Sequence, residues 1–175
     1  MLDVSLSYNR YKFLGYEFLT WLWYAIENDR PLLKKILQES AALGIGNRLV
    51  VENKRGDKSE SITIKGDDAG LEEGVLALQK GALVTELNLS YKVNESEWRF
   101  TIKAESLHIG SLKCPATGGV ESPEDLEGAI LEKTYLCEMA FTAIDGLFRT
   151  FITLRTSDGW EKKVVAKIKK WIHQP

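Results

Sequence analysis

The chain has 175 residues, of which 44% are hydrophobic and 27% are charged, and its formal net charge is −2. This length and composition exclude an extensively disordered protein, because such a chain can bury about 70% of its extended surface. The slightly acidic balance also excludes the whole-domain basic charge of many nucleic-acid-binding proteins. We therefore expect one folded domain over residues 1–175, with any function carried by local features.

Apolar residues at helical spacing predict two helices near the N-terminus. The first contains the stretch LGYEFLTWLWYAIEND (14–29) and ends before Pro31. The second is expected from Pro31 to Leu43, with Gly44 as its stop. The segment LGIGNR (43–48) precedes a strand, which indicates a helix stop and turn rather than a dinucleotide-binding loop.

From Arg48 onward the hydrophobic period changes from 3.6 to 2. Residues 48–53 and 61–66 are predicted to form a hairpin, and residues 71–81 a helix closed by Gly81. Two more strands are expected, one with Leu87, Leu89 and Tyr91 alternating and one over residues 98–104. These elements predict a four-stranded sheet in the order β-β-α-β-β.

The last third of the chain is predicted to be helical. Ser122, Pro123 and Asp125 come close to a capping box at the start of a long helix. An apolar stripe runs on to Phe151 and indicates a helix of about 28 residues, kinked at Gly146. A final helix is expected after Asp158. The order of elements indicates an α+β fold, an antiparallel four-stranded sheet flanked by N-terminal and long C-terminal helices.

Catalytic and metal-binding motifs do not stand out. His108, His173, Cys114 and Cys137 lack the spacing of metal ligands, and no nucleophile elbow is present. A hydrolase built on His108 with Ser106 or Cys114 is an alternative, but a half-exposed histidine on an extended strand is the simpler interpretation. We predict a protein that is not an enzyme and that uses no cofactor or metal.

The outward face of the sheet is expected to be polar and almost neutral, with four bases against three acids and no aromatic ring. Such a face favours a solvated or docking surface over a platform for stacking bases. The residues predicted on it are Thr63, Lys65, Glu86, Asn88, Ser90, Lys92, Glu97, Arg99, Thr101, Lys103 and Glu105.

The last helix is the most basic local feature. At 100° per residue its apolar residues gather on one side, and its lysines spread over the opposite side. Nucleic-acid phosphates suit such a side, because each neutralised phosphate releases counterions, although lysines also serve as a solvated helix face. The predicted phosphate contacts are Lys162, Lys163, Lys167, Lys169 and Lys170.

The aromatic residues of the first helix cover more than one of its sides. A helix with so wide an apolar surface is either buried on several sides or shared with a partner. In the second case Trp21, Trp23 and Tyr24 would contact a second copy of the chain or a partner protein.

Cysteine usage and the N-terminus predict a cytoplasmic location. Two isolated cysteines are typical of a reducing compartment. Asp3, Arg10 and Lys12 stand where a signal peptide has an uncharged apolar segment. The aromatic stretch is shorter than the ~20 apolar residues that cross a bilayer, so no membrane partner is expected.

Four segments of the chain resemble the C-terminal half of divergent RdgC-type recombination-associated proteins. They are LGYEFLTWLWY (14–24), NRLVVE (47–52), WRFTIKAESLHIGSLKCP (98–115) and LEKTYLCEMAFTAIDGLFRTFITLR (131–155). The resemblance implies a non-enzymatic protein that dimerises into a ring around duplex DNA and restrains the recombinase filament. We therefore expect a recombination-associated module that binds double-stranded DNA through the basic last helix. The alternative is a protein-interaction or dimerisation module that uses the aromatic first helix.

Overall fold

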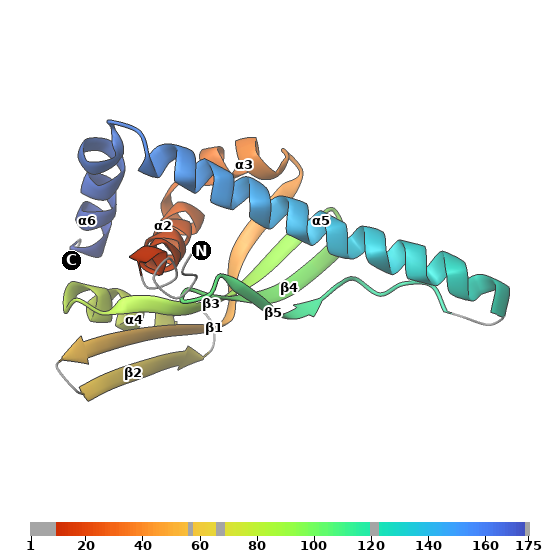
Figure 1. Ribbon diagram of the computed structural model, residues 1–175, viewed down its shortest axis with the longest axis horizontal. Helices are drawn as coiled ribbons and strands as arrows, with labels where there is room; N and C mark the ends of the chain where they lie inside the picture. Colours follow the sequence, from red (N-terminus) through yellow and green to blue (C-terminus); the bar gives the residue numbers. More distant parts are fainter. Residues whose placement is uncertain (1–9, 56–57, 66–68, 120–122, 174–175) are drawn as a thin grey trace, which may run out of the picture.

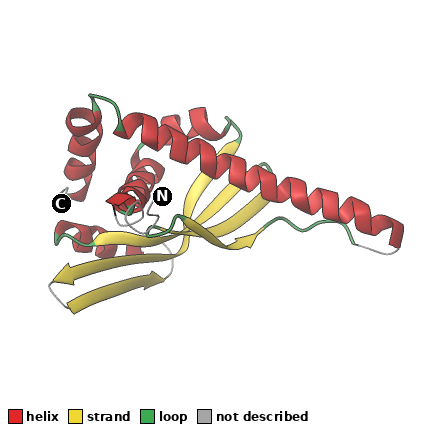
Figure 2. Ribbon diagram, in the orientation of Figure 1, coloured by secondary structure: helices red, strands yellow, loops and turns green. Residues whose placement is uncertain are grey.

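The computed structural model describes residues 10–55, 58–65, 69–119 and 123–173, and it shows helices packed on one face of a β-sheet (Figure 1). Figure 2 separates the two layers by colour. The strands are β1 (Ala41–Arg55), β2 (Lys58–Lys65), β3 (Leu83–Val93), β4 (Ser96–Lys103) and β5 (His108–Lys113). The helices are α2 (Phe13–Asn28), α3 (Arg30–Leu37), α4 (Ala69–Gln79), α5 (Pro123–Arg155), the π-helical η1 (Trp160–Val165) and α6 (Ala166–Ile172).

All neighbouring strands are antiparallel, and their order in the sheet is β2-β1-β3-β4-β5. Side chains alternate between the two faces of a strand, so the register decides which of them meet on the helix side. Leu49 of β1 pairs with Leu87 of β3, and Leu89 of β3 pairs with Phe100 of β4. All four side chains are at most 1% exposed. The expected mixture of helices with an antiparallel sheet is thus confirmed.

The sheet has five strands, so the prediction of four is wrong. The missed strand is β5, which pairs with β4 at the edge of the sheet. Ser106 and His108 do not share one extended strand, because residues 104–107 form a turn. Leu107 reverses the chain there with a φ of 51°. Residues 104–107 contain no Gly, Asn, Asp or Pro, the residues that most strongly mark a turn in a sequence.

The second helix is shorter than predicted and the first strand is longer. α3 ends at Leu37, and Gln38 leaves the helical conformation with a φ of 140°. The chain then enters β1, where Ala41 pairs with Val93 of β3. Residues 43–48 therefore belong to a strand and not to a helix stop. Pairing with β3 overrides the local turn propensity of the two glycines in this segment.

The long C-terminal helix has 33 residues, starts at Pro123 as expected, and continues through Gly146 as a single helix. A methyl group on Gly146 would lie 3.5 Å from Ile36 of α3, so this position is a close helix contact. The second half of α5 lies over α2 and α3, whereas its first half extends beyond the strands (Figure 1). The predicted N-cap residue, Ser122, lies outside the described residues.

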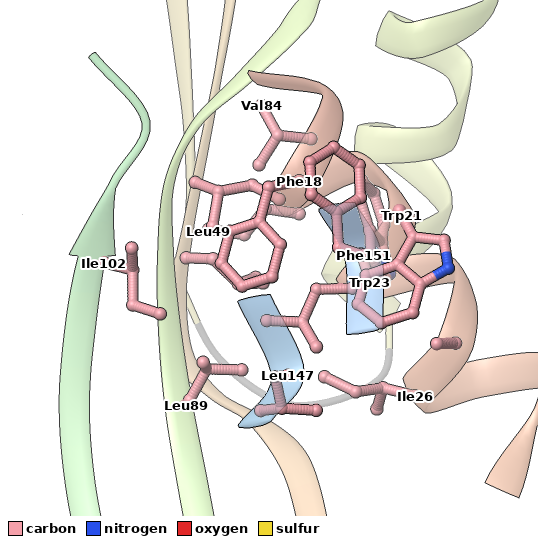
Figure 3. Close-up of a cluster of buried hydrophobic side chains, with 14 of the residues drawn as sticks. Phe18, Trp21, Trp23, Ile26, Leu49, Val84, Leu89, Ile102, Leu147 and Phe151 are labelled. Carbon is pink, nitrogen blue, oxygen red and sulfur yellow. The ribbon is translucent and has the colours of Figure 1, made fainter. Parts of the chain in front are cut away.

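The core is formed where α2 lies between the sheet and α5 (Figure 3). Phe18 packs edge-on against Phe148 of α5, with ring centroids 5.2 Å apart. The buried Trp98 ring also satisfies its one polar group, because its indole N–H donates a hydrogen bond of 2.9 Å to the Leu136 carbonyl oxygen. Since aromatic residues bury more area than other side chains, this layer dominates the stability of the fold.

Candidate nucleic-acid interface

The five predicted phosphate-contacting lysines lie on η1 and α6, which together we call the lysine segment (residues 160–172). Its apolar side is held by three buried residues, Trp160, Ile168 and Trp171. The Trp160 ring meets Phe151 of α5 at 5.7 Å between centroids, and Trp171 meets Trp23 of α2 at 5.2 Å. The lysine segment is therefore fixed to the core along one side only.

All five lysines of the segment are exposed: Lys162, Lys163, Lys167, Lys169 and Lys170. Within the described residues, none of their ammonium groups has a carboxylate oxygen within 4.0 Å. Glu161 is the one acid in the segment. Lys169 and Lys170 stand in the last turn of α6, where positive charge also complements the helix dipole. The segment thus presents a concentrated positive charge to solvent, and two of its charges have a structural explanation as well.

The aromatic residues proposed as a partner face lie mostly inside the protein. Trp21 is 1% exposed and Trp23 is 0% exposed, so these rings are part of the core of the folded chain. Tyr24 is half-buried and packs against the ring of Trp171 at 5.8 Å. Burial, followed by the negative charge of Asp29, raises the pKa of Tyr24. Wide apolar coverage of α2 is explained by its contacts with the sheet, α3, α5 and α6.

Large exposed apolar side chains gather instead on the first part of α5, which we call the α5 arm (residues 125–141). The predicted apolar stripe of this helix includes two of them, Leu126 and Ile130, and a stripe can be covered only where the helix faces another element. The first part of α5 extends beyond the strands (Figure 1), and five large apolar side chains between residues 125 and 141 are exposed. They are Leu126 (51% exposed), Ile130 (56%), Leu131 (63%), Tyr135 (61%) and Phe141 (49%).

A polar hollow of about 600 Å³ lies on the outer face of the sheet, which carries no helix. We call it the sheet trough; it holds four bases and one acid and is lined by Asn47, Arg48, Glu86, Asn88, Arg99, Thr101, Lys103, His108, Gly110, Ser111 and Lys113. Five of the polar residues expected on β3 and β4 are among them: Glu86, Asn88, Arg99, Thr101 and Lys103. The near-neutral balance predicted for this face does not describe the trough, because β5 adds Lys113 and the long β1 adds Arg48.

Two carboxylates bind most of the neighbouring bases on this outer face. Glu86 lies between Arg48 at 3.3 Å and Lys103 at 3.5 Å. Glu97 accepts from Arg99 at 3.1 Å and from the Ser90 hydroxyl at 2.8 Å. These hydrogen bonds, that from Arg99 first, lower the pKa of Glu97. Lys113 has no carboxylate within 4.0 Å among the described residues.

The residues considered for a hydrolase are not brought together. Ser106 lies in the turn before β5, and His108 opens β5 on the outer face. Cys114 lies against α5, with its sulfur 3.6 Å from that of Cys137. Burial, and then the contact with Cys137, raises the pKa of Cys114, which disfavours a thiolate nucleophile. Within the described ranges no three His, Cys, Asp or Glu residues are grouped as metal ligands.

The fold and its surfaces define an α+β protein with a basic C-terminal helical segment and a polar sheet face. Among the helices in the described part of the chain, none combines the length and hydropathy needed to cross a membrane. Comparison with protein-family models, with curated proteins and with solved structures gave no match. The function therefore has to be inferred from the surfaces themselves.

Proposed function

We propose that this protein is a non-catalytic, cytoplasmic module that binds the phosphates of double-stranded DNA through the lysine segment. The role in recombination follows from its resemblance to RdgC-type proteins. The observation that carries the proposal is the set of five exposed lysines without a nearby carboxylate among the described residues. Their helical segment is anchored in the core by Trp160, Ile168 and Trp171. Binding can then use their charge without cost to the fold.

The geometry supports contacts with the DNA backbone rather than with bases. Lys162 of the π-helical η1 and Lys170 of α6 are separated by roughly 12 Å along the axis, if the α-helical rise of 1.5 Å per residue is applied to the whole span. One DNA strand presents about three phosphates over that length, at 3.4 Å per nucleotide. Trp160 and Trp171 are buried, so no large ring of the segment is free to stack on a base. Lysine ammonium groups act as point charges, and we expect binding that depends little on DNA sequence.

The test is the equilibrium binding of a labelled DNA duplex at low and moderate salt. The test variant changes all five lysines of the segment to glutamine. A matched control removes the same charge from exposed lysines elsewhere: Lys34, Lys35, Lys65, Lys80 and Lys133. We expect the test variant to lose binding and the control to stay within about threefold of the unchanged chain, apart from general charge effects. Equal losses in both variants, or retained binding in the test variant, would contradict the proposal.

A second candidate function is dimerisation, and it is favoured by the α5 arm rather than by α2. Leu131 and Tyr135 are more than 60% exposed on a helix that extends beyond the strands. Exposed apolar clusters of this kind mark interaction sites. Sedimentation velocity should then show a dimer that Leu131→Lys with Tyr135→Lys converts to a monomer. A monomer at all concentrations of the unchanged chain would exclude this function.

A further inference from the structure

The edge of the sheet that borders the trough contains a bulge with an unusual backbone. Arg99 of β4 pairs with Lys113 of β5 and Thr101 pairs with Gly110, so β5 has one residue more than β4 between these pairs. Ser111 lies in the bulge with a φ of 54°. This left-handed conformation is normally left to glycine, and a serine held there is a strained position of the kind found at binding sites.

The same place brings together positive charges that the protein does not neutralise fully. Arg99 and Lys113 are direct cross-strand neighbours, and like charges in that relation destabilise a sheet. Arg99 uses its Nη2 for Glu97, which leaves most of its five N–H donors available. Lys113 has no carboxylate within 4.0 Å in the described part of the chain. An anion between the two side chains would turn this repulsion into attraction.

Hydroxyl donors surround the same point. The Thr101 hydroxyl oxygen accepts a hydrogen bond of 2.9 Å from the Asn88 amide, so its own proton is directed elsewhere. Asn88 is itself held, because its oxygen accepts from the Asn47 backbone N–H at 3.2 Å. The Ser111 side chain is exposed within the trough. Two hydroxyls, a guanidinium and an ammonium form a donor set suited to a phosphate.

The surroundings favour a compact ligand over a long polyanion. Glu86 and Glu97 bracket the middle of the β3–β4 ladder, since Glu86 pairs with Lys103 and Glu97 with Lys92. A phosphate backbone running along the strands would meet both carboxylates. None of the trough-lining residues is aromatic apart from His108, so stacking of successive bases has no support. The volume of about 600 Å³ suits a small ligand.

We infer that the sheet trough binds the phosphate group of a small phosphorylated solute, held by Arg99, Thr101, Ser111 and Lys113. This site lies on the outer face of the sheet, whereas the helices lie on the other side, where α6 contacts α2 and α4. The inference does not depend on DNA binding by the lysine segment.

The test is an NMR titration of the ¹⁵N-labelled protein with inorganic phosphate, with sodium chloride at equal ionic strength as the reference. We expect saturable shifts at the Gly110 and Ser111 amides that chloride does not reproduce. Lys113→Gln should weaken binding about tenfold, as loss of one charge-assisted hydrogen bond implies. Lys65→Gln on β2 removes the same charge outside the trough and should leave the affinity unchanged. Shifts that do not saturate, or equal weakening by both variants, would overturn the inference.

Two further arms separate the ligand sources. The variant without the five lysines of the lysine segment should bind phosphate at the trough as the unchanged chain does. A short DNA duplex, added in place of phosphate, should shift the amides of α6 and leave those of Gly110 and Ser111 unchanged. If the duplex saturates the trough and Lys113→Gln prevents it, the occupant is a nucleic-acid backbone and the small-solute inference is wrong. If the trough binds phosphate and the amides of α6 do not shift with DNA, the proposed function is wrong and the phosphate inference stands.

Discussion

α2 and the lysine segment are neighbouring helical regions built around tryptophan, yet they have opposite relations to solvent. The Trp23 ring of α2 meets the Trp171 ring of α6 at an interplanar angle of 81°. α2 contacts the sheet, α3, α5 and α6, and half of its 16 residues are buried. The lysine segment has three buried residues and leaves its lysines in solvent. The number of neighbouring elements, and not aromatic content, decides which helix is available to a partner.

The largest effect is expected from Trp23→Ala in α2. Trp23 is 0% exposed, and its Cη2 atom lies close to the backbone of Gly74 in α4. The substitution removes a large ring and leaves a cavity, so the free energy of unfolding should fall by about 3–5 kcal/mol. Urea denaturation measures this change. A loss below about 1 kcal/mol would contradict a tightly packed core around α2.

Gly15→Ala tests the close approach of α2 to the sheet. A Cβ atom at this position would lie 1.8 Å from the backbone oxygen of Ala104, so α2 must move away from the end of β4. We expect the free energy of unfolding to fall by about 1–3 kcal/mol. Gly128→Ala in the α5 arm is the control, because nothing lies within 4 Å of its added Cβ. Higher helix propensity should make that control slightly more stable, and a loss in both variants would contradict the steric explanation.

Tyr24→Phe probes the contact between α2 and α6 through its pH dependence. Burial first, and Asp29 second, raise the pKa of Tyr24 above its ordinary value near 10. The unfolded chain therefore loses the phenol proton at lower pH than the folded chain, and the free energy of unfolding falls as the pH rises above about 10. Thermal melts at several alkaline pH values should show a smaller fall for Tyr24→Phe. An identical fall in stability in both proteins would show that Tyr24 does not contribute to the loss of stability at alkaline pH.

The smallest change in stability is expected from the five lysine-to-glutamine substitutions in the lysine segment. All five side chains are exposed, so the free energy of unfolding should stay within about 0.5 kcal/mol in total once the gain from reduced like-charge repulsion is counted. Urea denaturation on the same protein used for DNA binding checks this point. A loss of several kcal/mol would show that the lysines support the fold. Loss of DNA binding in this variant could then result from unfolding and would not identify the lysines as phosphate contacts.

Sequence periodicity predicted burial correctly wherever the pattern within a single helix or strand decides which of its side chains are buried. The alternation of Leu87, Leu89 and Tyr91 predicted the buried side of β3, and Pro123 marked the start of α5. Periodicity failed where another element decides the outcome. The first part of β1 becomes a strand because β3 lies beside it. Leu126 and Ile130 of the predicted stripe stay exposed because the first part of α5 extends beyond the strands.

The candidate sites divide in the same way. The exposure of the lysine segment followed from its own amphipathic pattern, although η1 is π-helical and departs from the assumed spacing of 100° per residue. The sheet trough was missed because it depends on β5, whose preceding turn contains Ser106 but no Gly, Asn, Asp or Pro. A signal was available in β4, because its alternation predicts Arg99, Thr101 and Lys103 on one outward face.

The most direct measurement of DNA binding by the lysine segment is the dependence of its affinity on salt concentration. The logarithm of the binding constant should fall linearly with the logarithm of the salt concentration, at about −0.9 per phosphate neutralised. Contact with about three phosphates predicts a slope near −3 for the unchanged chain, and a slope near zero once the five lysines are glutamines. The same slope in both proteins would contradict the lysine segment as the site of binding.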